Sequence, residues 1–147
     1  MNLKKLLFIV PMVIAFVNSN GQTKKQETKI EFEIFSDIPS AIDGCACIFS
    51  KNENDYNSKK YIFVNDFAKY AFVKINGKLE EFELVNNSEG KGENAYYVYK
   101  KGEIVLRIEI TKKLPDGDES SKLIGKMILL NSNGLKTVIE FFGTCGC

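Results

Sequence analysis

The sequence contains no histidine, and this absence restricts the chemistry that the protein can perform. Without an imidazole there is no Ser-His-Asp or Cys-His catalysis and no histidine-ligated metal. The sequence also lacks a glycine-rich phosphate-binding loop and a nucleotide-binding pattern. We therefore expect a protein that is not an enzyme and that uses no cofactor.

A strong charge of either sign and a long hydrophobic run are missing as well. The chain has 20 Lys and Arg residues against 19 Asp and Glu residues, a net charge of +1. A near-neutral surface exerts no long-range attraction on nucleic acid or anionic lipid. The apolar run over residues 6–17 is shorter than the roughly 20 residues that a membrane-spanning helix needs. We expect no nucleic-acid partner and no transmembrane segment in the mature form.

Residues 1–21 have the three-part organisation of a secretory signal peptide. Lys4 and Lys5 precede the apolar run, and small residues over 19–21 stand before Gln22. This pattern predicts cleavage before Gln22 and a secreted or periplasmic location. Thiols that reach such a compartment meet an oxidising environment in which disulfides persist.

The rest of the chain is predicted to form one domain. Residues 22–28 are polar and are expected to be a disordered linker, followed by a single β domain over 29–147. Apolar and polar residues alternate in short segments separated by turn residues, and Asn76-Gly77 is the strongest hairpin signal. Nine such segments predict an all-β fold, an antiparallel up-and-down barrel with a sandwich as the alternative. The segments are residues 30–34, 45–49, 61–65, 71–75, 79–85, 96–99, 104–110, 123–130 and 135–142.

Two local features of the predicted sheet follow from the same pattern. In the fifth segment the apolar positions shift from Leu79 to Phe82 and Leu84, which predicts a β-bulge near Glu80-Glu81. Three polar stretches rich in turn residues are predicted as surface loops. They are residues 50–60, 86–94 and 114–122.

All four cysteines lie in two Cys-x-Cys pairs near the ends of the predicted domain. Residues two apart on a strand share a face, so adjacent antiparallel strands can place Cys45 opposite Cys147 and Cys47 opposite Cys145. In the chain-entropy model, a disulfide closing a loop of about 100 residues stabilises the fold by roughly 4.7 kcal/mol. We expect disulfides that close the barrel.

The same four residues allow other interpretations. Cys45, Cys47, Cys145 and Cys147 could form a tetrahedral thiolate site for zinc or monovalent copper. Structural zinc sites, however, usually separate paired cysteines by two to four residues. A redox-active pair would need the Cys-x-x-Cys spacing, which the chain lacks. Four cysteines permit three disulfide connectivities, and the sequence leaves the choice open.

Aromatic residues are concentrated near Tyr96, Tyr97 and Tyr99, and again at Phe141 and Phe142. Packing in the core and across strands is the main expectation for them, because pleated surfaces favour aromatic rings. Adjacent residues on a strand point to opposite faces. One of Tyr96 and Tyr97 is therefore expected to be exposed or to lie in the barrel mouth, and both are candidate binding residues.

Two resemblances follow from short motifs. Asp-Gly-Cys-x-Cys over residues 43–47, Ile-Asn-Gly over 75–77 and the final Gly-Thr-Cys-Gly-Cys resemble small exported bacterial proteins of uncharacterised families. The region 72–110 contains the Asn76-Gly77 turn, Leu84, a Ser-Glu-Gly loop over residues 88–90, tyrosines, and Lys101-Gly102 before an aliphatic strand. In this order of features it resembles the periplasmic lysozyme inhibitors of the MliC type, which are small antiparallel barrels with a disulfide. In those inhibitors a Ser-x-Gly loop enters the lysozyme cleft, so the resemblance implies binding roles for Ser88 and Lys91. The cysteine arrangement and the tyrosine spacing depart from that family.

These observations together predict a non-enzymatic, disulfide-stapled binding or structural protein of the bacterial envelope. It would contact a protein or an envelope component through its polar loops. Metal binding through the four cysteines and lysozyme inhibition are the alternatives.

Overall fold

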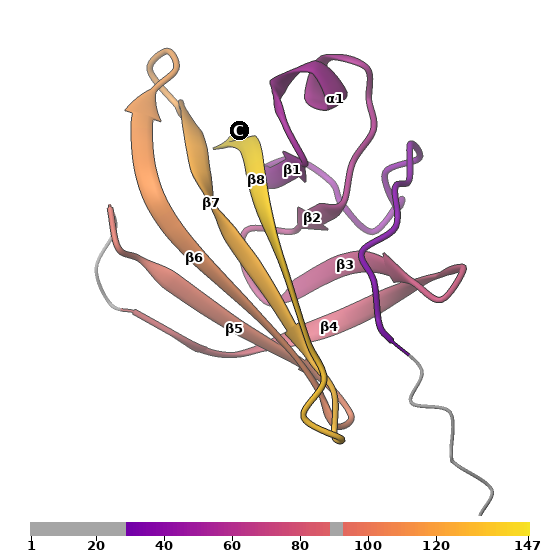
Figure 1. The fold of residues 1–147 in the computed structure, drawn as a ribbon. Coiled ribbons are helices and arrows are strands. Elements are labelled where there is room, and N and C mark those ends of the chain that lie inside the picture. Colours follow the sequence, from indigo (N-terminus) through magenta and orange to yellow (C-terminus); the bar gives the residue numbers. More distant parts are fainter. Residues whose placement is uncertain (1–28, 89–92) are drawn as a thin grey trace, which may run out of the picture.

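The computed structural model describes residues 29–88 and 93–147. In this part of the chain eight antiparallel strands form a closed barrel in the order β1 to β8, and each strand pairs with its neighbours in sequence (Figure 1). The up-and-down barrel prediction is confirmed. The predicted signal peptide and linker lie outside the described residues. The elements are β1 Ala46–Ser50, α1 Glu53–Asn57, β2 Phe63–Asn65, β3 Tyr70–Ile75, β4 Lys78–Asn87, β5 Tyr96–Lys101, β6 Ile104–Pro115, β7 Ser120–Leu130 and β8 Lys136–Gly146.

The prediction of nine strands is wrong by one. The segment 30–34 alternates as a strand does, but residues near it make only two isolated bridges, Glu33 with Lys74 and Phe35 with Tyr61. The physical reason is its position. β1 and β2 have only five and three residues, so they pair with only part of β8 and of β3, and the segment 30–34 contacts the parts of those two strands that they leave unpaired.

The N-terminal segment connects β3 and β8 without forming a regular strand, and Figure 1 shows it passing beside β3. On the β8 side the Thr137 hydroxyl donates a 2.5 Å hydrogen bond to the Ile30 carbonyl. On the β3 side the Glu33 N–H donates to the Lys74 carbonyl at 2.9 Å. Ile30 and Phe32 are buried in the main core. The alternation that predicted a strand therefore marks a plug with one apolar face.

The predicted bulge at Glu80-Glu81 is also misplaced. The ladder between β3 and β4 runs without interruption from Tyr70–Glu83 to Ile75–Lys78. Two apolar faces explain the shifted pattern: Phe82 is buried in the barrel, whereas Leu79 packs against a second cluster outside it. The register of β4 against β5 changes between Leu84 and Asn86, a few residues later than predicted.

A short helix lies in the stretch 50–60 that was predicted as a loop. The Asn52 side-chain oxygen accepts a 2.9 Å hydrogen bond from the Asp55 N–H, which caps the start of α1. From this helix the Tyr56 hydroxyl lies 2.6 Å from the Thr144 hydroxyl, and its ring meets Phe142 edge-on at 5.7 Å. α1 therefore covers part of the outer face of β8.

The seam between β1 and β8 carries both disulfides. The two strands pair with Cys47 opposite Cys145, and the disulfides join Cys45 to Cys147 and Cys47 to Cys145. In each bond the two Cα atoms are 4.0 Å apart. The predicted register is confirmed. Each sulfur is bonded to another sulfur, so the alternative of a four-thiolate metal site is wrong, and the described residues contain no other cluster of three metal-binding side chains.

A row of stacked aromatic rings crosses this seam inside the barrel. The ring of Phe49 stacks on Phe63 at 4.8 Å and on Phe141 at 4.1 Å, so the row joins β2, β1 and β8. Gly143 stands opposite Phe49 and makes room for it, because a Cβ at this position would overlap the Phe49 ring and the Ile48 carbonyl oxygen.

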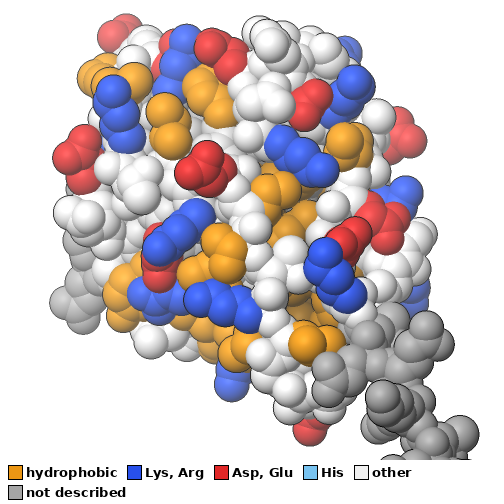
Figure 2. Space-filling model, in the orientation of Figure 1, with side chains coloured by type: hydrophobic (Ala, Val, Ile, Leu, Met, Phe, Trp, Pro, Cys, Tyr) orange, Lys and Arg blue, Asp and Glu red, His pale blue; other side chains and the backbone are white. Residues whose placement is uncertain are grey.

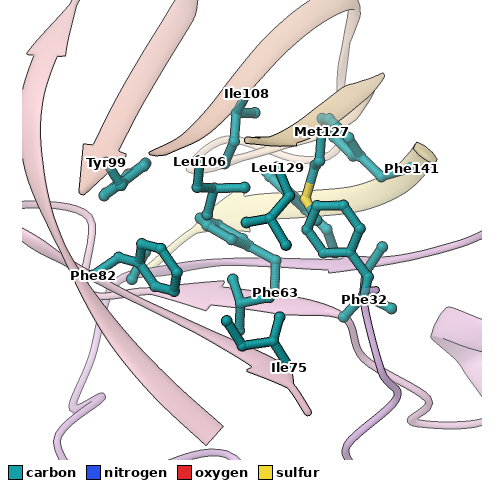
Figure 3. Close-up of a cluster of buried hydrophobic side chains, with 14 of the residues drawn as sticks. Phe32, Phe63, Ile75, Phe82, Tyr99, Leu106, Ile108, Met127, Leu129 and Phe141 are labelled. Atoms are coloured by element: carbon teal, nitrogen blue, oxygen red, sulfur yellow. The ribbon is translucent and has the colours of Figure 1, made fainter. Parts of the chain in front are cut away.

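The base of the barrel, the end with the β3–β4, β5–β6 and β7–β8 turns, is densely filled. Large buried side chains from β3, β4, β6 and β7 and from the N-terminal segment meet there (Figure 3). The outer surface is mixed: on the face in Figure 2, hydrophobic side chains alternate with charges of both signs. The buried side chains at the base include Phe32, Val73, Ile75, Phe82, Leu106, Met127 and Leu129.

The substitution Gly143→Ala should destabilise the fold by about 3 kcal/mol, the upper end of the usual cost of overpacking. The added methyl group has nowhere to go, because one of its neighbours is backbone. Gly134→Ala is the control: its surroundings are open, so only its positive φ costs energy, about 1–2 kcal/mol. Urea unfolding of both variants measures this. Equal losses would contradict the steric account.

The stabilisation that each disulfide provides should depend on whether the other disulfide has already formed. The first to form closes a loop of about 100 residues and contributes roughly 4.7 kcal/mol, whereas the second closes only the small ring between the rungs and contributes roughly 2 kcal/mol. Replacing either cysteine pair by alanine should therefore cost roughly 2 kcal/mol, and replacing both roughly 7 kcal/mol. Urea unfolding without reductant measures this, and additive losses would contradict it.

Candidate functional site: the mouth of the barrel

The mouth of the barrel, opposite its base, contains a cavity of about 460 Å³. The β2–β3, β4–β5 and β6–β7 connections and the end of β8 surround it. Its lining is mainly apolar and includes five aromatic side chains. They are Phe49, Phe63, Phe67, Tyr97 and Tyr99.

Tyr99 forms the floor of this cavity. It projects from β5, and its hydroxyl accepts a 3.1 Å hydrogen bond from the Asn65 side-chain amide on β2. These strands are three apart around an eight-stranded barrel, so the tyrosine side chain crosses the interior. Its ring also meets Phe63 edge-on at 6.0 Å. The filled base lies on one side of this contact and the cavity on the other.

Asn65 is the centre of a polar network in an otherwise apolar wall. It is the last residue of β2 and is only 8% exposed. Its side-chain oxygen accepts hydrogen bonds from the N–H groups of Cys47, at 2.9 Å, and Phe67, at 3.2 Å. Two backbone donors on the oxygen fix the orientation of the amide, because only its nitrogen remains to donate to Tyr99.

Phe67 stands at the mouth in a backbone conformation that bulky residues rarely adopt. Its φ is 65°, and its side chain lines the cavity while remaining 54% exposed. The neighbouring Asp66 carboxylate holds the turn by accepting hydrogen bonds from the N–H groups of Ala68, Lys69 and Tyr70. Burial acts to raise the pKa of Asp66, but these backbone donors outweigh it and lower the pKa. The exposed ring thus stands on a turn that three hydrogen bonds to Asp66 hold in place.

The inner disulfide forms part of the cavity wall. Cys47 and Cys145 both line the cavity, and both pack against the main core. Lys113 and Glu119 are the charged residues among the described lining, and both are exposed. The cavity therefore combines an apolar interior, a disulfide in its wall, one buried polar pair at its floor and charges at its rim.

The sequence-predicted binding residues fall in different places. Tyr97 lines the cavity, whereas Tyr96 lies on the outer face, with the Arg107 guanidinium 4.3 Å from its ring centre. Ser88 also lines the cavity, and its hydroxyl accepts a 3.0 Å hydrogen bond from the Tyr96 N–H. Lys91 lies outside the described residues.

Sequence reasoning missed Asn65, Phe67 and Tyr99 as site residues. Tyr99 could have been found, because it shares a strand face with Tyr97. The Asn65-Asp66 pair after an apolar segment is a turn signal, and both side chains do bond to following backbone N–H groups. The cross-barrel contact between Asn65 and Tyr99 depends on strand positions that the local sequence does not reveal.

Comparison of the chain with protein-family models, curated proteins and solved structures gives no match. Among the residues that the structure describes, no helix has the length and hydrophobicity needed to cross a membrane. Fold and site together define the protein as a small antiparallel barrel with an open cavity at one end. Two disulfides join β1 to β8 at the same end.

The buried Tyr99 should make the fold sensitive to alkaline pH. Burial raises the pKa of its hydroxyl to about 12 in the folded protein, against 10.0 for an ordinary tyrosine, although the hydrogen bond with Asn65 opposes the shift. The stabilisation is complete below pH 10 and is lost as the pH rises towards 12, by about 2–3 kcal/mol. Tyr99→Phe should remove this part of the decline in unfolding free energy, whereas Tyr96→Phe should keep it. Urea unfolding at several alkaline pH values tests the prediction, and parallel curves for wild type and Tyr99→Phe would refute it.

Proposed function

We propose that this protein is a non-enzymatic, exported binding protein that takes a small apolar ligand into the mouth of its barrel. Two disulfides support export, because such bonds persist in oxidising compartments such as the bacterial periplasm. The volume of about 460 Å³ supports ligand binding, since small-molecule sites typically measure about 300–1,000 Å³.

The observation that carries the proposal is the unequal filling of the barrel. An eight-stranded barrel is just wide enough to be filled by its own side chains or to hold one small ligand. Here large side chains fill the base, while the half beyond Tyr99 is left open despite its aromatic lining. A closed core would be the simpler way to stabilise the fold. The open half is therefore best explained by a guest molecule.

Two of the three predicted polar loops, residues 86–94 and 114–122, contribute to the lining of the cavity. Ser88, at the start of the β4–β5 connection, lines the cavity, so a ligand inside it and a protein partner at the rim would meet the same end of the barrel. This placement supports the lysozyme-inhibitor-like role as the second candidate. Filling the cavity separates the two, because it removes space for a small ligand while leaving the outer surface of the loops in place.

The test uses the neutral naphthalene dye Prodan, whose fluorescence changes on entering an apolar site. Wild-type protein should bind one dye molecule. Ala95→Phe should weaken binding at least tenfold, because Ala95 is buried and lines the cavity. Val85→Phe is the matched control, since Val85 is 52% exposed and absent from the described lining. Ser121→Phe, on β7, provides a second cavity-filling variant. Equal dye affinity in all four proteins, or none in wild type, would rule out this cavity as the site.

A further inference from the structure

The hydroxyl of Tyr99 has one unused hydrogen-bonding function. The side chain is only 3% exposed, and its oxygen accepts a hydrogen bond from Asn65. The Asn65 side-chain oxygen does not accept the tyrosine proton, because it already accepts hydrogen bonds from two backbone N–H groups. Among the described residues no acceptor takes the tyrosine proton. A buried O–H donor therefore remains available at the cavity floor, where polar groups are normally paired.

The side chains that share the cavity with this donor are mainly apolar, and several are aromatic. Phe49, Phe63 and Phe67 line the same cavity, with Leu84 and Ile108 from the other strands. Aromatic walls favour planar rings, which can stack or meet them edge-on. The charged lining residues Lys113 and Glu119 are exposed, so they belong to the rim and leave the floor without a charge partner.

We propose that the cavity selects a neutral, planar, ring-bearing molecule that carries an acceptor oxygen, such as a ketone carbonyl, at its inner end. The Tyr99 O–H donates to this oxygen, and the rings of the molecule lie between the aromatic walls. This assignment rests on the proposed function and adds the chemistry and the orientation of the ligand.

The dimensions of the cavity agree with this class. An apolar cavity of about 150 Å³ holds one benzene molecule, so about 460 Å³ corresponds to roughly three rings of that size. A carboxylate would have to give up its hydration at a floor that offers a single donor. A pure hydrocarbon would cover the tyrosine proton without accepting it, which leaves a buried donor unsatisfied.

Three naphthalene probes of one shape test the assignment by calorimetric titration. Acetylnaphthalene has the acceptor, isopropenylnaphthalene replaces its oxygen by a methylene group, and naphthoate carries a charge. Wild-type protein should bind the ketone roughly 2- to 12-fold more tightly than the hydrocarbon, the range expected for one net hydrogen bond. Naphthoate should bind more weakly than the ketone.

Tyr99→Phe should abolish this preference while leaving the affinity for the hydrocarbon within about twofold, because only the donor is removed. Tyr96→Phe, on the outer face, should keep the preference. Asn65→Asp is a second variant. Its carboxylate still accepts the two backbone N–H groups and also takes the Tyr99 proton, so the preference should again fall. Near-ultraviolet circular dichroism checks that each variant is folded.

The outcomes separate the inference from the function on which it rests. Ketone and hydrocarbon binding equally well to wild type, or a ketone preference that survives Tyr99→Phe, would overturn the assigned chemistry while the cavity remains a binding site. Failure of both neutral probes to bind would overturn the proposed function itself. A preference present in wild type and Tyr96→Phe, and lost in both Tyr99→Phe and Asn65→Asp, would establish the assignment.

Discussion

Pairing of β1 with β8 is the constraint on which the rest of the structure depends. β1 is only five residues long, yet it must close a sheet whose other strands reach eleven and twelve residues. Backbone pairing over so short a ladder is supplemented by two adjacent disulfides on the same face. The same register brings Gly143 beside Phe49 and so creates the aromatic row. The N-terminal segment contacts the parts of β3 and β8 that the short strands leave unpaired.

The cavity and the seam are two parts of one arrangement. β2 ends at Asn65, and there a side chain instead of the backbone satisfies the Cys47 N–H. The same asparagine side chain then donates from its amide nitrogen to Tyr99, which projects from the opposite side of the barrel. The residue that ends a short strand at the seam therefore also supports the floor of the cavity. A change that disturbs the pairing of Cys47 should therefore also disturb the contact between Asn65 and Tyr99.

Much of the fold was predictable, because it depends on local alternation and on the spacing of the cysteines. Eight of the nine predicted segments form strands, and their order and the Cys47–Cys145 register follow from period-2 patterns, the Asn76-Gly77 turn and two Cys-x-Cys pairs. The errors arose at apolar residues that are packed but do not follow the pattern of the barrel interior. Residues 30–34 contact β3 and β8 without forming a strand, and Leu79 packs outside the barrel. The site escaped prediction because Asn65 and Tyr99 are far apart in sequence and meet only across the closed barrel.

The disulfide between Cys45 and Cys147 has a mechanical consequence. It joins residues 102 positions apart, so the barrel strands lie within a covalent ring. Tension applied between the N-terminal segment and Cys147 passes through two sulfur atoms and bypasses every strand of the sheet. Only the segment before Cys45 lies in the path of the force, where it is held by two isolated bridges, the hydrogen bond from Thr137 and three buried side chains. Under load the protein would shed its plug and keep its barrel.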